Sequence, residues 1–190
     1  MLVKITGKSA HAAHPEDGIS AIEIAAHSIS LLQTGWIDPI TTVNIGLIEG
    51  GQVINAVPEK VTIQIECRSQ KHQKCLQQSQ LIKKTFQIVA KARGAKAEID
   101  MNLGLKASRI AENTQVVRIA KKAIQSVGLS PKTKIICGGT DASNLNLKGI
   151  KTAVLGIGGK LPHSKNENIA LADIEKAIEI LKAILKEYSE

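Results

Sequence analysis

The sequence predicts a mixed α+β fold in its first half and an alternating α/β arrangement in its second half. Two observations carry this prediction. Residues 1 to about 105 follow the order strand, helix, strand, strand, helix, strand, and helices then alternate with strands. The composition agrees with a folded chain, because 43% of the 190 residues are hydrophobic. This length predicts one large or two small domains, with enough chain to bury a core.

The first predicted elements are a short strand over residues 2–6, a loop over 7–15 and a helix over about 18–33. The apolar residues of this helix recur on one face: Ile22, Ala25, Ala26, Ile29 and Leu32. Gly35 is expected to end the helix, and residues 38–39 are expected to lie in a connecting loop.

Two strands follow, over residues 41–49 and 60–68, and apolar residues alternate with polar ones along both. A helix over 71–92 has one apolar stripe with lysines outside it, and a strand over 96–103 completes the set. This order is that of the split βαβ unit, the ferredoxin-like arrangement. We therefore expect a ferredoxin-like βαββαβ domain over residues 1–105.

In the second half, predicted helices and strands alternate along the sequence. Its predicted elements are helices over 113–127, 142–148 and 171–187, and strands over 133–137 and 151–156. Two parallel strands by themselves make an incomplete sheet with an unpaired edge. We therefore expect residues 106–190 to be an incomplete α/β remnant of a larger domain.

The chain has a net charge of +8, from 25 Lys and Arg against 17 Asp and Glu. Such a balance is compatible with nucleic acid or with an anionic ligand. Single-stranded nucleic acid is bound by exposed aromatic residues, and the chain has only Trp36, Phe86 and Tyr188, none on a predicted strand. We therefore expect no nucleic-acid partner, and an RNA-binding domain is the least favoured alternative.

The remaining composition predicts a cytoplasmic protein. No stretch reaches the roughly 18–20 apolar residues of a membrane span, so we expect no membrane partner. No secretory signal follows Met1. The three cysteines, Cys67, Cys75 and Cys137, are odd in number and lack a CxxC spacing. This pattern argues against a disulfide framework or a zinc knuckle and fits a reducing compartment.

Three candidate site residues lie in the first half, and each has an ordinary alternative. His11 lies in a small-residue loop, where an imidazole can meet a ligand or be an ordinary loop histidine. The side-chain amide of Asn55 can donate to a substrate oxygen, or Asn55 can simply favour a turn before Pro58. Arg68 can bind a carboxylate with two hydrogen bonds, or pair with Glu66 at the surface.

Further candidates follow the predicted strands of the second half. Gly138, Gly139 and Thr140 precede a helix, where backbone N–H groups can form an anion nest. The segment is not a Walker loop, because it lacks the GK[ST] ending. The alternative is that Asp141 serves only as a helix N-cap. His163 lies in a loop where a neutral imidazole can bind zinc, although one histidine is not by itself a metal site.

Taken together in this order, five segments resemble those of the zinc-dependent exopeptidases that include peptidase T and peptidase T-like tripeptidases. Glutamate carboxypeptidases, aminoacylases and succinyl-diaminopimelate desuccinylase are related members. The segments are GKSAHAAHPEDGISAIEIA (7–25), TTVNIGLIEGGQVINAVP (41–58), ECRS (66–69), GGTDASNLNLKGIKT (138–152) and GKLPHSKNE (159–167). The resemblance covers nearly all of the chain. It implies a lid and dimerisation domain over 1–105 and the C-terminal part of the catalytic domain over 106–190.

The resemblance also implies roles for the candidate residues. His11 matches the lid histidine that reaches the partner subunit's active site and stabilises the tetrahedral oxyanion. Asn55 and Arg68 match lid residues that bind the substrate, with Arg68 on a carboxylate. The remaining matches are Gly138, Gly139 and Thr140 in the loop that lines the substrate pocket, and His163 as the last zinc ligand. The implied partners are a short peptide and a second copy of the chain, joined through the lid.

The chain departs from the family pattern in its metal ligands. The HxD motif, the bridging Asp, the Glu-Glu pair and a further acidic ligand of the family have no counterpart here. Of a site with two zinc ions per subunit, the chain retains one ligand, His163, and one imidazole cannot hold a zinc pair. We therefore expect a fragment of a tripeptide aminopeptidase-like zinc metallopeptidase, inactive by itself. The alternative is a non-catalytic dimerisation module.

Overall fold

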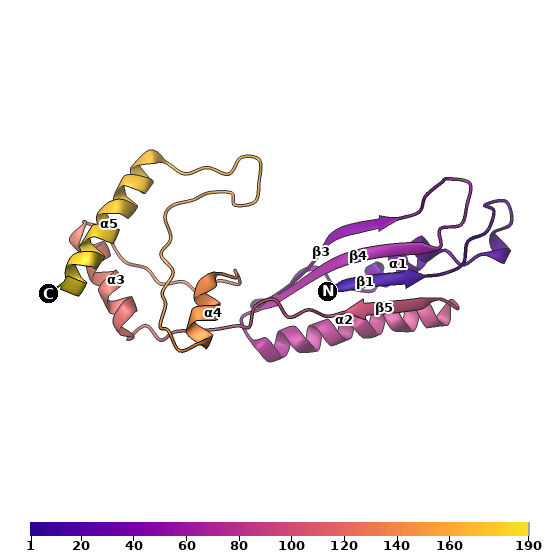
Figure 1. The fold of residues 1–190 in the computed structure, drawn as a ribbon, viewed down its shortest axis with the longest axis horizontal. Coiled ribbons are helices and arrows are strands. Elements are labelled where there is room, and N and C mark those ends of the chain that lie inside the picture. Colours follow the sequence, from indigo (N-terminus) through magenta and orange to yellow (C-terminus); the bar gives the residue numbers. More distant parts are fainter. Residues whose placement is uncertain (190) are drawn as a thin grey trace. The chain divides into compact units, whose positions relative to one another are not determined.

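The computed structural model describes residues 1–189, and residue 190, the last of the second predicted domain, lies outside the described residues. The chain divides into two compact units, Met1–Ala107 and Ser108–Glu190. Figure 1 shows a sheet with helices in the first unit, and helices joined by long loops in the second. Residues 101–111, where the boundary falls, form neither helix nor strand.

The first unit contains a five-stranded antiparallel sheet with the strand order β2-β3-β4-β1-β5. Its strands are β1 (Leu2–Thr6), β2 (Gly35–Asp38), β3 (Thr41–Gly50), β4 (Lys60–Ser69) and β5 (Lys96–Asp100). β1 lies between β4 and β5, so that Val3 is opposite both Ile63 and Ile99. The predicted α+β class is confirmed for this half, and all four expected strands are present.

Two helices, α1 (Ala21–Ser30) and α2 (His72–Ala92), pack against the buried face of this sheet and against each other. Ile63 and Ile65 of β4 are buried on this face, and the residues between and beside them are more exposed. Phe86 of α2 is the largest fully buried side chain of the core. Removing these apolar side chains from water is the main favourable term in folding.

Strand β2 corrects the expectation that Gly35 only ends the first helix and that residues 38–39 lie in a connecting loop. Gly35 pairs with Val43 and Trp36 with Thr42, so the one tryptophan lies on an edge strand. The segment is short and lacks apolar alternation, so its conformation depends on β3 as a hydrogen-bonding partner rather than on its own residues. The central strands β1 and β4 carry no aromatic residue.

The second unit contains three helices in its described residues: α3 (Gln115–Ser126), α4 (Asp141–Leu147) and α5 (Leu171–Ser189). α3 packs against α5. The three helices expected from the sequence are therefore all present. Within the described residues, no helix is both long enough and apolar enough to cross a membrane.

The two strands predicted for the second unit are wrong: residues 133–137 and 151–156 form no strand. A strand exists only where a second extended segment pairs with its backbone groups. Among the described residues of this unit, the one such pairing is the isolated bridge between Lys160 and Asn168. Apolar residues of the predicted strands therefore stay half-exposed, as Ile136 does at 53%.

Replacing Phe86 by alanine should destabilise the first unit by about 3–5 kcal/mol, because it leaves a cavity in the core. Urea unfolding followed by the fluorescence of Trp36, the only tryptophan, measures this loss. Ile88→Ala is the matched control in α2, since Ile88 is 67% exposed and its truncation should change the stability by less than about 0.5 kcal/mol. Equal losses in the two variants would contradict the described core.

Candidate functional site

The loop after β1 and the loop before β4 pair through their backbones. The amide of Ala12 donates to the carbonyl of Asn55 at 3.0 Å. Next to this bond, His11 forms an isolated antiparallel bridge with Ala56. Two predicted site residues from distant parts of the sequence, His11 and Asn55, are thereby held beside each other.

The imidazole of His11 is exposed, and its Nδ1 accepts a hydrogen bond of 3.1 Å from the amide of Ala13. A neutral ring whose Nδ1 accepts a bond carries its proton on Nε2, so Nε2 is the donor that a ligand would meet. His14 lies nearby, with ring centroids 6.3 Å apart, and its Nδ1 is 3.7 Å from a carboxylate oxygen of Glu16. The described residues hold no group of three or more His, Cys, Asp or Glu side chains that could bind a metal ion.

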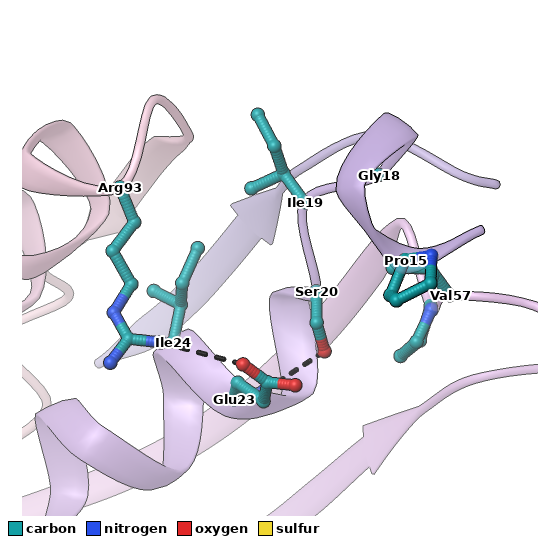
Figure 2. A pocket seen from close by; sticks show the side chains of 9 residues that line it. Pro15, Gly18, Ile19, Ser20, Glu23, Ile24, Val57 and Arg93 are labelled. Atoms are coloured by element: carbon teal, nitrogen blue, oxygen red, sulfur yellow. Dashed lines mark hydrogen bonds and ion pairs between the residues drawn. The ribbon is translucent and has the colours of Figure 1, made fainter. Parts of the chain in front are cut away.

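A cavity of about 330 Å³ lies beside these loops, and sequence reasoning did not anticipate it. Figure 2 shows Glu23 between Ser20 and Arg93 in its wall. The amide of Glu23 donates to Ser20 Oγ at 3.2 Å, and Arg93 Nη1 lies 3.5 Å from Glu23 Oε2. Val57, which follows Asn55 in the paired loop, lines the same cavity. Glu23 and Arg93 are 70 positions apart, so no local pattern indicates this pair.

Arg68 lies at the other end of β4 from these loops. Thr6 is opposite Lys60, so the loop of His11 begins beside the start of β4, whereas Arg68 is eight residues further along. At about 3.3 Å per residue, the separation is roughly 26 Å. Arg68 Nη2 lies 2.7 Å from Glu66 Oε1, which is the surface ion pair considered as the alternative from the sequence. The first unit does not bring Arg68 to the other two predicted residues.

The end of the sheet that holds Arg68 carries a second ion pair. Lys74 Nζ in α2 lies 2.8 Å from Asp38 Oδ2 at the end of β2. This bond to Lys74, together with the amide of Ile40 donating to Asp38 Oδ1 at 2.8 Å, lowers the pKa of the Asp38 carboxyl. This end of the sheet therefore carries two surface ion pairs, Arg68 with Glu66 and Lys74 with Asp38.

Gly138, Gly139 and Thr140 lead into α4, as the sequence predicts. Thr140 is the N-cap residue, and its carbonyl accepts a bond of 2.9 Å from the amide of Ser143. Among the described residues, its side chain makes no capping hydrogen bond. Asp141 is the first residue of the helix and not its cap, which rules out the N-cap alternative for that carboxylate.

His163 lies in a loop that two backbone hydrogen bonds close. Lys160 donates to the carbonyl of Asn168 at 2.8 Å, and Asn168 donates back at 3.2 Å. The φ angle of His163 is 65°, in the left-handed region that non-glycine residues rarely adopt, and its amide donates to Glu167 Oε2 at 3.1 Å. The imidazole is exposed and belongs to no group of three metal-ligating side chains in the described part of the chain.

Residues 1–101 match the family model of the peptidase dimerisation domain, M20_dimer. The chain belongs to the M20 peptidase family and is peptidase T-like. The resemblance inferred from the five sequence segments is therefore confirmed. The uncharacterised protein YqjE of Bacillus subtilis is 39% identical over 184 residues, which are 96% of this chain and 50% of YqjE.

Two solved structures resemble the chain over nearly all of its length. A tripeptidase from Staphylococcus aureus has a TM-score of 0.89 at 36% identity, over 97% of this chain and 50% of that protein. The aminopeptidase PepT from Bacillus cereus has a TM-score of 0.84 at 36% identity, over 100% of this chain and 51% of that protein. The chain thus spans about half the length of these relatives.

Gly7→Ala should open the loop that carries His11. A Cβ at Gly7 would lie 2.1 Å from the backbone oxygen of Ile19, which is held by the bridge between Lys8 and Ile19. We expect the free energy of unfolding to fall by roughly 1–3 kcal/mol and the NMR signals of the His11 imidazole to shift. Gly104→Ala is the control, because a Cβ there meets no atom within 4 Å. Unchanged stability and His11 signals in Gly7→Ala would refute the described loop packing.

Proposed function

We propose that the chain is the dimerisation lid and the C-terminal catalytic segment of a zinc-dependent exopeptidase that hydrolyses short peptides from the N-terminus. The observation that carries this proposal is the similarity over 97% of the chain to the S. aureus tripeptidase. Because the chain spans 50% of that protein, the activity belongs to a larger protein of which this chain forms part. We assign the reaction to the cytoplasm, a reducing compartment that fits the three free cysteines.

In this proposal, His11 stabilises the oxyanion of the tetrahedral intermediate with its Nε2–H donor, and the side-chain amide of Asn55 binds the substrate. The exposed ring and the bond from Ala13 to Nδ1 support this role, because they leave Nε2 as the donor. The backbone hydrogen bond between Ala12 and Asn55 supports the proposal that both loops contact the same substrate, because it holds them together. One oxyanion donor contributes about 10²–10³ to kcat.

The position of Arg68 supports a homodimer. We propose that Arg68 binds the substrate carboxylate, yet it lies roughly 26 Å along the sheet from the loop of His11. An extended tripeptide spans at most about 11 Å. One such peptide cannot contact both residues of the same chain, so each active site would take His11 from one subunit and Arg68 from the other.

The residues of this chain do not by themselves fit a zinc pair. The described residues contain no group of three or more metal-ligating side chains. We propose that His163 is the last zinc ligand, that Gly138, Gly139 and Thr140 line the substrate pocket, and that the other ligands come from the half of the relatives' length that this chain does not span. When bound, the metal supplies an activated water for peptide hydrolysis.

The surface of the second unit supports its assignment as part of a larger domain. Its buried apolar residues are three alanines in the described part of the chain: Ala120, Ala123 and Ala142. Larger side chains stay exposed, such as Leu181 at 53% and Leu185 at 68% in α5. We propose that this unit is the incomplete α/β remnant and that the first unit, which ends at residue 107, is the ferredoxin-like lid.

A non-catalytic dimerisation module is the second candidate. The match of residues 1–101 to the peptidase dimerisation domain favours it, because self-association needs none of the metal ligands. In that case His11 and Arg68 have no role in catalysis or substrate binding.

The chain by itself should not hydrolyse tripeptides, even with added zinc, because it lacks a metal-binding group in its described residues. A tripeptide hydrolysis assay on the purified chain measures this, with the S. aureus tripeptidase as the positive control. Turnover by the chain alone would contradict the expectation. A chimera with the S. aureus tripeptidase separates the two candidates, since only the enzyme fragment should complete an active site there.

A chimera tests the proposed roles, with residues 1–190 replacing the matching half of the S. aureus tripeptidase. We expect the chimera to cleave tripeptides, and both His11→Ala and Arg68→Ala to lower kcat/KM by about 10²-fold or more. Mixing the two inactive variants should restore about a quarter of the activity, because one of the two sites in each hybrid dimer is intact.

The matched control is His14→Ala, in the same loop as His11, which should leave activity within about twofold. A folded, active chimera in which His11→Ala keeps full activity would refute the role of His11. Mixed variants that regain no activity would refute the division of each site between two subunits.

A further inference from the structure

Two cysteines of the first unit meet across the turn that joins β4 to α2. Cys67 lies near the end of β4, and Cys75 lies in the first turn of α2. Cys75 Sγ donates to the carbonyl of Cys67 at 3.3 Å, and Cys67 Sγ donates to the carbonyl of Cys75 at 3.8 Å. Each thiol therefore reaches the backbone of the other residue.

The two thiols also act on each other directly. Burial raises the pKa of Cys67 to about 12, and the thiol of Cys75 adds to this shift through its charge and a hydrogen bond. The hydroxyl of Ser79, on the next turn of α2, opposes this rise of the Cys67 pKa in part. Cys67 packs against the edge of the buried core. The reduced pair is thus a small polar cluster between the sheet and the helix.

We propose that Cys67 and Cys75 are the site of a reversible intrachain disulfide that clasps the end of β4 to the first turn of α2. A disulfide needs Cα atoms within about 7 Å and side chains that face each other. The contacts of 3.3 and 3.8 Å place each sulfur beside the backbone of the other cysteine, so the two side chains lie on facing sides of the connection between β4 and α2. Only residues 70 and 71 connect β4 to α2 between the two cysteines, so little chain has to be reordered.

The oxidant in this proposal is a low-molecular-weight disulfide of the glutathione type. The thiolate of Cys75 attacks one sulfur of the oxidant, which forms a mixed disulfide and releases one small thiol. Cys67, which loses its proton as it reacts, then attacks the Cys75 sulfur and displaces the second small thiol. Two protein thiols are oxidised, one external disulfide is reduced, and the two protons leave with the two small thiols. Cys67 reacts second because burial holds it as the protonated thiol.

The disulfide would join Cys67, the residue before Arg68 in β4, to α2, close to the contact between Lys74 and Asp38. Oxidation therefore ties the backbone of Arg68 to α2. The formation of the disulfide does not depend on the proposed peptidase function, because it follows from the contacts of the two cysteines alone. An odd number of cysteines is compatible with this site, because Cys137 lies in the second unit.

Thiol counting on the unmodified chain tests the proposal. The reduced chain should titrate three thiols, and after equilibration with oxidised glutathione Cys67 and Cys75 should titrate none and carry no glutathione, a loss of two hydrogens from the peptides that hold them. Peptide mapping should link Cys67 to Cys75, and dithiothreitol should restore all three thiols. The melting temperature of the oxidised form should rise by roughly 5 °C or more.

Three variants make the assignment specific. Cys137→Ser should still form the intrachain disulfide, whereas Cys67→Ser should stop at a glutathione adduct on Cys75. Cys75→Ser should take up glutathione at Cys67 at least about tenfold more slowly than Cys67→Ser does at Cys75. Three remaining thiols in the oxidised chain, or a link that involves Cys137, would overturn the proposal.

Discussion

The antiparallel pairing of β1 with β4 is the constraint on which the first unit depends. Val3 lies opposite Ile63, and both are fully buried beneath the helices. The N-terminal ammonium donates to the carbonyl of Ile65 at 2.7 Å, which anchors the start of β1 in the same register. A slip of one residue would turn these apolar side chains to the solvent, so burial strongly favours one register.

This register also determines which predicted site residues can meet. Thr6 is opposite Lys60, so the chain leaves β1 and enters β4 at the same end of the sheet, and the two adjoining loops pair there. His11 and Asn55 are neighbours because of this pairing. Arg68 lies at the opposite end of β4 for the same reason. The ion pair of Arg68 with Glu66 is exposed, and pairs of this kind contribute little to stability.

The second unit lacks a comparable pairing in its described residues, and its properties follow from that. Segments with the composition of strands have no partner strand, so their apolar side chains remain half-exposed. α3 and α5 pack together, but small alanines supply the buried apolar residues. The relatives that resemble the chain over nearly all of its length are about twice as long. Within the first unit, the same reliance on neighbours explains the contact of Cys67 with Cys75, which needs β4 and α2 to be folded.

The sequence by itself determined the elements whose residues repeat with a clear period, and it determined the family. The alternation along β4 and the apolar stripe of α2 are local properties, because each side chain's direction follows from its own backbone. Local patterns could not predict that β2 is a strand, nor that the segments 133–137 and 151–156 are not. A strand depends on hydrogen-bonding partners, which can be distant in the sequence. Only the tertiary structure decided that His11 lies beside Asn55 and far from Arg68, because the register of the sheet sets those distances.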